Sequence, residues 1–472
     1  MKSPLVSVII PAYKNAEFLS DAINSVLKQT YSHFELIIVN DASPDNTDEV
    51  VKTFYDPRIK YILHEKNKGL SAARNTGIRN STGDYIALLD GDDYFHPDKL
   101  KAHVQFLKRH PDIDVTYNAR FELNHSSDTI RELWRPPVTV DLSDLILGYP
   151  FAPSDMVIRR ERIFKVGLFE ESYTYYGEDM DINCKLALDG CKFASVDRAL
   201  NYRRFHSRRI IQNLRAYQED EFRPLYNTFA SDRFPIELSS YKDIAFSNRY
   251  LGWAIFAFLQ EDTDLGQEYC LEAVRLNPSL LEGRPNGLLN EIIRYCILDD
   301  NRDHGELLRL VLNQLPDQLS FNEMTQSWSI SRGFILKGIR AIIWDRIEEG
   351  RAYITQAIDS LAGINKPLLT QTAFDLINYE REFGWDATRS VINNLAPSFE
   401  KIRNLTGIHW SEGFYLLSKA YKNFDEHEYS KVPSLIIKAI FRDNSILRNR
   451  GIIKLFILSV LKTLHKLLGG KK

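Results

Sequence analysis

The sequence predicts an α/β domain with a mostly parallel sheet, followed by a mainly α-helical domain. Two observations predict this division. In the first half, short apolar runs rich in β-branched residues alternate with stretches of helical periodicity, which is the pattern of βαβ units. From about Tyr241 onward, one helical stretch follows another with few strand signals. A chain of 472 residues is also long for a single core, so two or more cores are expected.

Consecutive segments of the first half alternate between strand and helix. Val6–Ile10 is a continuous apolar run that suits a parallel strand covered on both faces. Ala16–Gln29 then carries apolar residues at helical spacing. The alternation continues with a strand at Glu35–Val39, a helix at Thr47–Phe54, a strand at Ile59–Leu63, a helix at Ser71–Ile78 and a strand at Tyr85–Leu89. We expect right-handed βαβ connections between these strands.

Three polar segments follow predicted strands at their carboxyl ends. They are Pro11–Asn15, Asp41–Asn46 and Asp90–Asp93. Ligands of open α/β sheets bind at the carboxyl ends of the strands. The sequence therefore predicts that these three loops surround one crevice.

The last of these loops holds three carboxylates, Asp90, Asp92 and Asp93, around Gly91, which allows the chain to bend tightly. Carboxylates at this spacing repel one another unless a cation lies between them. A hard divalent cation that carries a phosphate-bearing substrate is the usual partner. A solvated acidic turn is the alternative, and the neighbouring segments decide between the two.

Those neighbouring segments resemble a known family. They are Val6–Asn15 with Glu35–Ser43, Lys68–Gly77 leading through Gly83–Tyr85 to the acidic loop, and Tyr176–Asp181. With these segments in this order, residues 5–210 resemble the family-2 glycosyltransferases, whose fold is the Rossmann-like GT-A fold. No comparable resemblance covers the remaining half of the chain. We therefore expect a GT-A domain over residues 1–235.

The resemblance implies a binding site for a nucleotide-diphosphate sugar, with UDP as the expected nucleotide. Asp41 would accept a hydrogen bond from the uracil ring. Its alternative role is to form an Asx turn, and the two roles are compatible. Arg74 would bind the nucleotide or its phosphates through its guanidinium group. The alternative is a salt bridge on a helix surface. The expected donor-binding residues are Pro11, Ala12, Tyr13, Asp41, Arg74, Asp90 and Gly91.

The resemblance also implies a divalent metal. Oxygen ligands favour Mn²⁺ or Mg²⁺ over softer ions. Asp92 is the expected direct ligand. Asp90 would contact either the ribose of the nucleotide or, through a water molecule, the metal. Asp93 would support the loop. His206 occupies a place where related enzymes often supply a further ligand or phosphate contact. A structural or merely exposed histidine is the alternative.

Asp179 is the expected catalytic base. In Gly177-Glu178-Asp179 the glycine frees the backbone, and the carboxylate opens a predicted helix. A plain helix-capping carboxylate is the alternative, because anions are stabilised at helix amino termini. As a base, Asp179 would take the proton of the acceptor hydroxyl while its oxygen attacks the anomeric carbon. The acceptor then enters opposite the departing diphosphate, so we expect inversion of the anomeric configuration.

The expected function is metal-dependent, inverting transfer of a sugar to a glycan or lipid-linked glycan acceptor in polysaccharide assembly of the cell envelope. The chain lacks the Gln-x-x-Arg-Trp element and the membrane spans of processive synthases, which favours a single transfer. Two alternatives remain. A nucleotidyltransferase acting on sugar phosphates would carry a Gly-rich, basic phosphate loop where this chain has Pro11–Asn15. A degenerate glycosyltransferase would serve as a scaffold through its helical half.

Composition and charge limit the partners and the cellular compartment that we expect. The net charge of -3 gives no overall field for nucleic acid, so we expect no nucleic-acid partner. Four cysteines without paired spacing favour a reducing compartment. The amino terminus lacks the pattern of a secretion signal, and no uncharged apolar run reaches the ~20 residues that a membrane span needs. We expect a cytoplasmic protein, with peripheral attachment to the membrane as a further expectation.

The helical region over 241–445 contains three weakly self-similar stretches. Their alignment places Ala273, Ala357 and Ala439 in register. Small residues at helix crossings resemble tetratricopeptide-type repeats, and an irregular helical bundle is the alternative. Such a region could bind the acceptor or a protein partner.

Residues 446–472 form a predicted basic amphipathic helix. An anionic membrane surface is one expected partner for such a helix, and packing against the helical domain is the alternative. The apolar face holds Ile453, Phe456, Ile457, Val460, Leu461, Leu464, Leu467 and Leu468, and the polar face holds Lys454, Ser459, Lys462, Thr463, His465 and Lys466.

Overall fold

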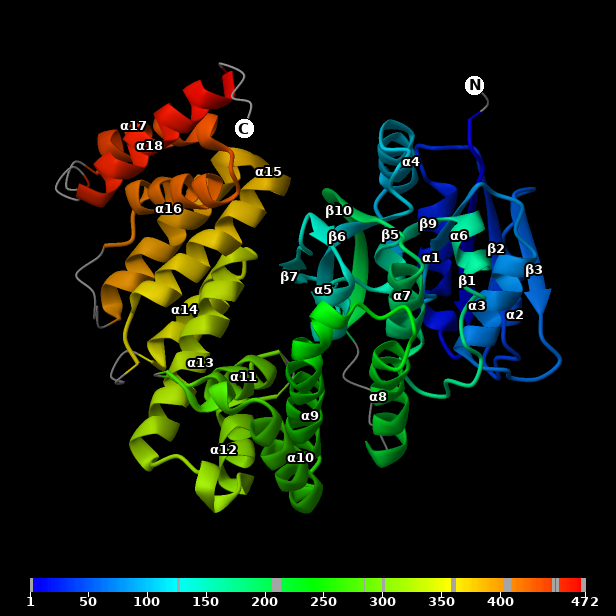
Figure 1. Cartoon of the computed structure of the whole chain (residues 1–472), viewed down its shortest axis with the longest axis horizontal. Coiled ribbons are helices and arrows are strands. Elements are labelled where there is room, and N and C mark those ends of the chain that lie inside the picture. The colour runs from blue at the N-terminus through cyan, green and yellow to red at the C-terminus, as the bar shows by residue number, and fades with distance from the viewer. Residues whose placement is uncertain are drawn as a thin grey trace. The chain divides into compact units, whose positions relative to one another are not determined.

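The computed structural model describes residues 3–124, 128–205, 214–283, 285–298, 302–357, 362–402, 409–443, 446 and 450–467. The chain divides into two compact units (Figure 1). The first comprises Met1–Tyr295, Asp299–Asn301 and Leu310–Ser320, and the second comprises Cys296–Leu298, Arg302–Arg309 and Phe321–Lys472. The first unit therefore extends well past the boundary expected near 235–241 and takes in helices that the sequence assigned to the second domain.

Four parallel strands form one side of the sheet in the first unit. Their spatial order is β3-β2-β1-β4. Ile9 of β1 pairs with Ile37 on one side and Leu88 on the other, so the apolar runs lie side by side in the sheet. This part confirms the parallel arrangement read from the sequence. The strands are β1 (Val6–Ala12), β2 (Phe34–Asn40), β3 (Ile59–Leu63) and β4 (Tyr85–Leu88).

The other side of the sheet is mixed. Beyond β4 the order continues β9-β6-β10-β5, with β7 paired to β6 and β8 paired to β10. β9 runs antiparallel to both of its neighbours, whereas β6 and β10 are parallel to each other. The sheet is thus mixed rather than parallel throughout, because a short strand is inserted in the reverse direction. These strands are β5 (Tyr94–Phe95), β6 (Val115–Asn124), β7 (Ile130–Trp134), β8 (Thr139–Val140), β9 (Val157–Arg159) and β10 (Phe193–Phe205).

Helices pack against the sheet and complete the first unit. On β1 the alternating residues Val6, Val8 and Ile10 join one core with Leu19 and Ile23 of the first helix, and all five are fully buried. The helices are α1 (Ala16–Leu27), α2 (Thr47–Lys52), α3 (Leu70–Arg79), α4 (Lys99–Arg109), α5 (Leu142–Leu147), α6 (Arg160–Lys165), α7 (Glu178–Leu188), α8 (Leu214–Phe229), α9 (Lys242–Leu259), α10 (Thr263–Leu276) and α11 (Gly287–Cys296). The 3₁₀ turns are η1 (Pro153–Asp155), η2 (Ile236–Tyr241), η3 (Pro278–Leu281) and η4 (Asp317–Leu319).

The second unit is helical in its described residues. A Cβ placed on Gly338 would lie 2.7 Å from the carbonyl oxygen of Gly350, and the reverse distance is 2.6 Å, so α13 and α14 cross at backbone contact. Ala273, Ala357 and Ala439 are all fully buried, but Ala273 belongs to the first unit, and a tetratricopeptide-like repeat is not confirmed. The elements are α12 (His304–Gln314), which starts in this unit, α13 (Glu323–Ile343), α14 (Ile347–Thr355), α15 (Lys366–Lys401), α16 (Glu412–Asp425), η5 (Tyr429–Lys431), α17 (Val432–Arg442) and α18 (Arg450–Leu467).

Among the described residues, every helix is too short or too polar to cross a lipid bilayer.

Candidate active site

The three predicted loops meet at the carboxyl edge of the parallel strands. Pro11, Ala12, Tyr13, Asp41, Asp90, Gly91 and Asp92 all line one cavity of about 560 Å³. A second cavity, of about 660 Å³, shares Lys14, Leu70, Asp90 and Asp92 with the first. The second cavity is also lined by Arg74 and Asp179. We call them the strand-loop cavity and the base cavity. The acidic loop belongs to both.

Asp41 organises one wall of the strand-loop cavity. Its Oδ1 accepts a hydrogen bond from the backbone N of Lys68 (2.8 Å) and lies 2.7 Å from His64 Nδ1, while Oδ2 accepts one from Gly69 N (2.8 Å). Gly69 has a φ of 92°, a conformation that favours glycine. His64 Nε2 lies 3.0 Å from Thr76 Oγ1 on α3. Asp41 therefore fixes the loop that carries Asn67 and Gly69 into the cavity.

A second acidic residue joins two of the loops. Asp45 Oδ2 accepts a hydrogen bond from Ala16 N (3.1 Å) at the start of α1, and Oδ1 accepts from the hydroxyls of Ser43 and Thr47 (2.6 Å each). Burial alone would raise the pKa of Asp45, but these hydrogen bonds lower it. The expected Asx-type geometry of this loop is thus supplied by Asp45 and Asn40, whose Oδ1 accepts from Ser43 N, rather than by Asp41.

The three carboxylates of the acidic loop differ in their surroundings. Asp90 and Asp92 face both cavities. Asp93 is 3% exposed and accepts hydrogen bonds from Ser154 Oγ (2.9 Å) and from the backbone N of Arg204 (3.2 Å). Burial, and then the charges of Asp92 and Asp90, raise the pKa of Asp93 well above its usual range. Asp93 therefore anchors the loop to η1 and β10, in line with its expected supporting role.

The bend at Gly91 is forced by a close contact. A Cβ at this position would lie 2.2 Å from Asn15 Nδ2, so the loop after β4 packs directly against the loop after β1. Gly91 lines the strand-loop cavity, and its contact with a donor stays a prediction.

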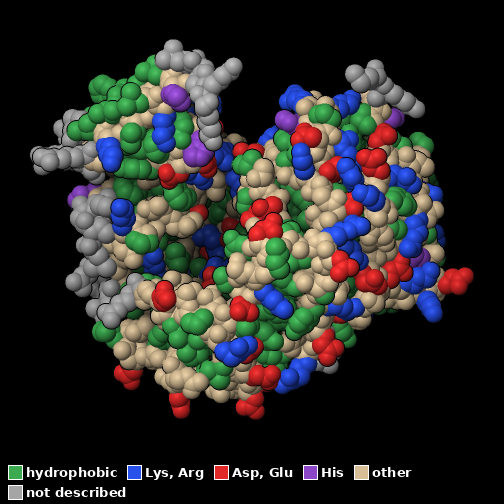
Figure 2. All heavy atoms as spheres, viewed as in Figure 1, with side chains coloured by type: hydrophobic (Ala, Val, Ile, Leu, Met, Phe, Trp, Pro, Cys, Tyr) green, Lys and Arg blue, Asp and Glu red, His purple; other side chains and the backbone are tan. Residues whose placement is uncertain are grey.

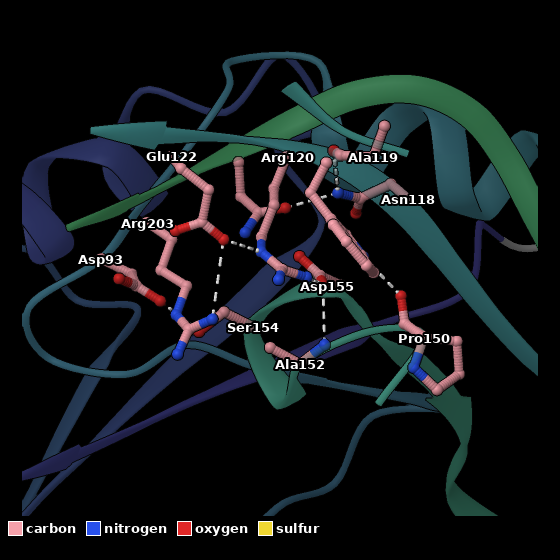
Figure 3. Close-up of polar contacts among 12 residues, drawn as sticks. Asp93, Asn118, Ala119, Arg120, Glu122, Pro150, Ala152, Ser154, Asp155 and Arg203 are labelled. Atoms are coloured by element: carbon pink, nitrogen blue, oxygen red, sulfur yellow. Dashed lines mark hydrogen bonds and ion pairs between the residues drawn. The ribbon is translucent and has the colours of Figure 1, made fainter. Parts of the chain in front are cut away.

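Ion pairs of Arg120 and Arg203 lie near Asp93 of the acidic loop (Figure 3). Arg120 pairs through Nε with Glu122 Oε1 (2.7 Å) and through Nη1 with Asp155 Oδ2 (2.6 Å). Arg203 Nη1 lies 3.6 Å from Glu122 Oε1, and its charge opposes the rise in the pKa of Asp93. These contacts connect β6, β10 and η1 and hold the floor of the base cavity.

Arg74 connects the acidic loop to the segment that carries the predicted base. Its Nη2 donates to Asp90 Oδ1 (2.8 Å) and its Nη1 to Glu178 Oε1 (2.9 Å). Arg74 thus forms salt bridges, as the alternative to nucleotide contact expected, but its side chain is almost fully buried rather than on a helix surface. Its guanidinium also lies 5.3 Å from the centre of the Phe169 ring. Contact of Arg74 with the nucleotide stays a prediction, with two of its nitrogens already bonded to carboxylates.

Asp179 lies in the first turn of α7. Gly177 precedes it with a φ of 91°, and a Cβ there would lie 2.5 Å from the carbonyl oxygen of Asp220, so the helix start requires glycine. Asp179 Oδ1 accepts from the adjacent backbone amide, Met180 N (2.7 Å), while the N-cap position of the helix is Gly177. Burial, and then the charge of Glu221, raise the pKa of Asp179, while Arg74 and the Met180 bond oppose this. A carboxylate with increased proton affinity suits a general base.

Sequence reasoning did not identify the residues around Glu221, whose charge acts on Asp179. Glu221 of α8 is buried and accepts a hydrogen bond from Tyr149 Oη (2.6 Å). Arg249 of α9 has its Nε 3.6 Å from Glu221 Oε1, and its guanidinium lies 4.1 Å from the Tyr149 ring centre. Burial raises the pKa of Glu221, and Arg249 opposes this. We call these three residues the Glu221 group. Two helices outside the recognised segments thus contribute to the electrostatics of the base.

The predicted metal ligands are only partly described. His206 lies outside the described residues. The residues that the structure describes contain no group of three or more His, Cys, Asp and Glu side chains placed to hold a metal.

Comparison with known proteins finds a family match for part of the first unit. Residues 7–167 match the family model described as glycosyl transferase family 2. The chain carries a family-2 glycosyltransferase domain. The matched range contains the acidic loop and all the predicted donor-site residues, whereas α7, the Glu221 group's helices and the whole second unit lie outside it.

Individual relatives agree with this family. The chain is 35% identical over 179 residues to the uncharacterized glycosyltransferase RP339 of Rickettsia prowazekii, covering 37% of this chain and 56% of that protein. It is 39% identical over 127 residues to the UDP-Glc:α-D-GlcNAc-diphosphoundecaprenol β-1,3-glucosyltransferase WfgD of Escherichia coli, covering 27% of this chain and 50% of that protein. The chain thus spans about half the length of these curated relatives. Among solved structures, S. aureus TarS 1-349 in complex with UDP-GlcNAc aligns with a TM-score of 0.42 and 18% identity, covering 75% of this chain and 90% of that one.

Proposed function

We propose that the protein transfers one sugar from a nucleotide-diphosphate donor, with UDP as the nucleotide, to a hydroxyl of a glycan or lipid-linked glycan, with inversion at the anomeric carbon. One observation carries the proposal. The acidic loop lines two adjoining cavities, and Asp179 lines the base cavity but not the strand-loop cavity. A donor in the strand-loop cavity and an acceptor in the base cavity would meet at Asp90 and Asp92.

The family match supports glycosyl transfer over the nucleotidyltransferase alternative. The name of WfgD includes a UDP-sugar donor and a diphosphoundecaprenol-linked acceptor. That relative supports UDP and a lipid-linked glycan as the classes to test first, in an envelope or surface polysaccharide.

The acceptor oxygen forms a bond to the anomeric carbon while the bond from that carbon to the donor phosphate oxygen breaks. The electron pair leaves with the nucleoside diphosphate, and the acceptor proton moves to the Asp179 carboxylate. Arg74 holds Asp90 and Glu178 together, so it keeps the acidic loop and the start of α7 in a fixed relation.

The residues of the acidic loop fit Mn²⁺ or Mg²⁺. Asp90 and Asp92 line both cavities, and carboxylate oxygens are the ligands that these ions prefer, so these two aspartates would hold the ion. Mg²⁺ is typically bound by one or two carboxylates together with waters and substrate phosphates, so two aspartates suffice. When bound, such an ion supplies counter-charge for the leaving diphosphate. The role of His206 as a further ligand remains part of this proposal.

The test uses the full chain with Mn²⁺ and UDP. We expect ultraviolet-absorbing UDP to stay with the metal-loaded protein through gel filtration and to be released by a chelator. A panel of UDP-sugars should then show slow, metal-dependent hydrolysis of one donor in the absence of acceptor. Retention of UDP without hydrolysis or transfer of any nucleotide sugar would favour the scaffold alternative. Equal retention with and without chelator would contradict the assigned metal role.

A further inference from the structure

Helix α18 has two apolar faces, and only one of them is covered. Ile452 and Leu455 are 2% and 6% exposed, and Ser459, on the same side, is fully buried. This inner face packs on α17 and η5 within the second unit. Ser459, which the sequence predicts on the polar face, is therefore buried, and the buried Ile452 and Leu455 are absent from the predicted apolar face. Phe456 of the predicted apolar face also packs against this core.

The outer face carries a separate apolar stripe. Ile453, Ile457, Leu461 and Leu464 follow one another at intervals of four, four and three residues, which places them along one side of the helix. Each is between 48% and 56% exposed. Figure 2 shows hydrophobic side chains gathered at the upper left, over the part of the second unit where Figure 1 draws α17 and α18. Single exposed apolar residues are ordinary, but a continuous row marks an interaction surface.

The neighbouring helix α17 repeats this arrangement. Its inner residues Leu435 and Ile436 are buried, whereas Ile437 is 45% and Phe441 86% exposed, four residues apart on one face. Exposed apolar side chains, including a large aromatic one, are therefore present on both helices.

The charges on these two helices have one sign. Within α17 and α18 every charged residue of the sequence is basic, and neither helix contains an Asp or Glu. The exposed basic side chains are Lys438, Arg442, Lys454, Lys462 and Lys466. Arg442 is paired with Glu412 (Nε to Oε2, 3.2 Å), and Lys462 donates to Tyr429 Oη (3.2 Å), so Lys438, Lys454 and Lys466 carry the argument. A row of apolar side chains flanked by cations is complementary to the headgroup and acyl boundary of an anionic bilayer. A second copy of the chain is a poorer fit, because a two-fold contact through this face would bring like charges together.

We propose that the outer face of α17 and α18 docks on the surface of a lipid bilayer that contains anionic lipids. The stripe residues Ile453, Ile457, Leu461 and Leu464 enter the acyl boundary, and the lysines lie at the headgroups. This goes beyond glycosyl transfer, because it assigns the second unit a ligand of its own. It does not depend on the proposed donor, acceptor or base, so its test and theirs are independent.

The experiment measures co-sedimentation of the full chain with vesicles. We expect binding to vesicles of phosphatidylcholine mixed with phosphatidylglycerol, weaker binding in high salt, and little binding to phosphatidylcholine alone. Ile457→Asp with Leu461→Asp should abolish binding. Ile236→Asp is the matched control, because Ile236 is 83% exposed in the first unit and the same change there should leave binding intact.

A second variant keeps the test valid if the aspartates disturb folding. Lys454→Gln with Lys466→Gln alters only exposed positions, and each lost charge should weaken partitioning into anionic vesicles about fivefold. Unchanged melting temperatures would show that both variants are folded.

Three results would overturn the proposal. One is failure of the wild-type chain to bind anionic vesicles at low salt. Another is equal binding by the wild type and by a folded Ile457→Asp, Leu461→Asp variant. The third is self-association that the stripe variant abolishes, in the absence of vesicle binding, which would assign the face to a second copy of the chain.

Discussion

The two cavities of the first unit are built in different ways. The strand-loop cavity is lined mainly by short segments that directly follow β1, β2 and β4, and its polar contacts join neighbouring loops. The base cavity draws on α3, η1, α7, α8 and β10, and the pKa of its base depends on Glu221, which Arg249 of α9 opposes. The first cavity is a product of sheet topology, whereas the second depends on side chains brought together from distant parts of the chain. Substitutions should therefore separate donor handling from proton transfer.

The largest effect is expected at the loop that both cavities share. Asp92→Ala should remove catalysis and its metal activation together, because the diphosphate loses its counter-charge. A loss of several kcal/mol corresponds to roughly a thousandfold in rate. The measurement is the transfer rate against Mn²⁺ or Mg²⁺ concentration. Asp112→Asn, a change at an exposed position, is the control and should behave as wild type. An unchanged metal activation curve for Asp92→Ala would exclude the acidic loop as the metal site.

Arg74→Lys tests the connection between the two cavities. A lysine has a single ammonium group and cannot reproduce both short contacts to Asp90 and Glu178. Incomplete pairing of buried carboxylates should lower the free energy of unfolding by up to about 3 kcal/mol. Both the denaturant midpoint and the transfer rate should fall. A variant with wild-type stability and rate would show that the two carboxylates need no common partner.

Gly177→Ala should lower stability and the transfer rate by more than the positive φ of Gly177 alone explains. Gly177 and Gly190 both have positive φ, but a Cβ at Gly190 meets nothing within 4 Å, whereas one at Gly177 meets the carbonyl oxygen of Asp220 at 2.5 Å. Gly190→Ala should cost about 1 kcal/mol of stability, and Gly177→Ala should cost more and also lower the transfer rate. Thermal unfolding and rate assays compare the two. Equal effects of the two substitutions would contradict the close packing of α7 against α8.

Glu221→Gln should have the smallest effect, and only at acid pH. The charge of Glu221 contributes to the raised pKa of Asp179, so its removal lowers that pKa. A base acts in its deprotonated form, and activity is lost as pH falls through its pKa. The acid limb of the pH–rate profile should therefore move to lower pH, with little change in rate at neutral pH. A limb that stays in place would mean that Glu221 does not tune the base.

Sequence reasoning identified the strand-loop cavity because its signals are local. A buried run followed by polar residues marks the carboxyl end of a strand, and Asp41 and Asp90–Asp93 all follow such runs. His64 carries the same signal, since it directly follows β3, and it could have been found in this way. The role of Asp93 as an anchor could not have been found from the sequence, because it depends on Ser154, which is 61 residues away.

The base cavity was predictable only in part. The motif around Asp179 was recognisable, but the buried pairing of Arg74 with Glu178 joins residues 104 positions apart. Glu221 and Arg249 lie in helices that resemble ordinary amphipathic segments, so no spacing marks them as electrostatic partners. The same limit applies to α18, where the helical wheel found an apolar face but not which residues the neighbouring helices would cover.

The central claim is that Asp179 removes the acceptor proton while the strand-loop cavity holds the donor. Asp179→Asn tests it most directly, with the transfer rate and the affinity for UDP measured on the same protein. An amide keeps the size of the side chain but cannot take the proton, so the rate should fall by ~10² to 10⁴-fold while UDP affinity stays within a few fold of wild type. A transfer rate within about threefold of wild type, far less than general-base catalysis normally contributes, would contradict the claim.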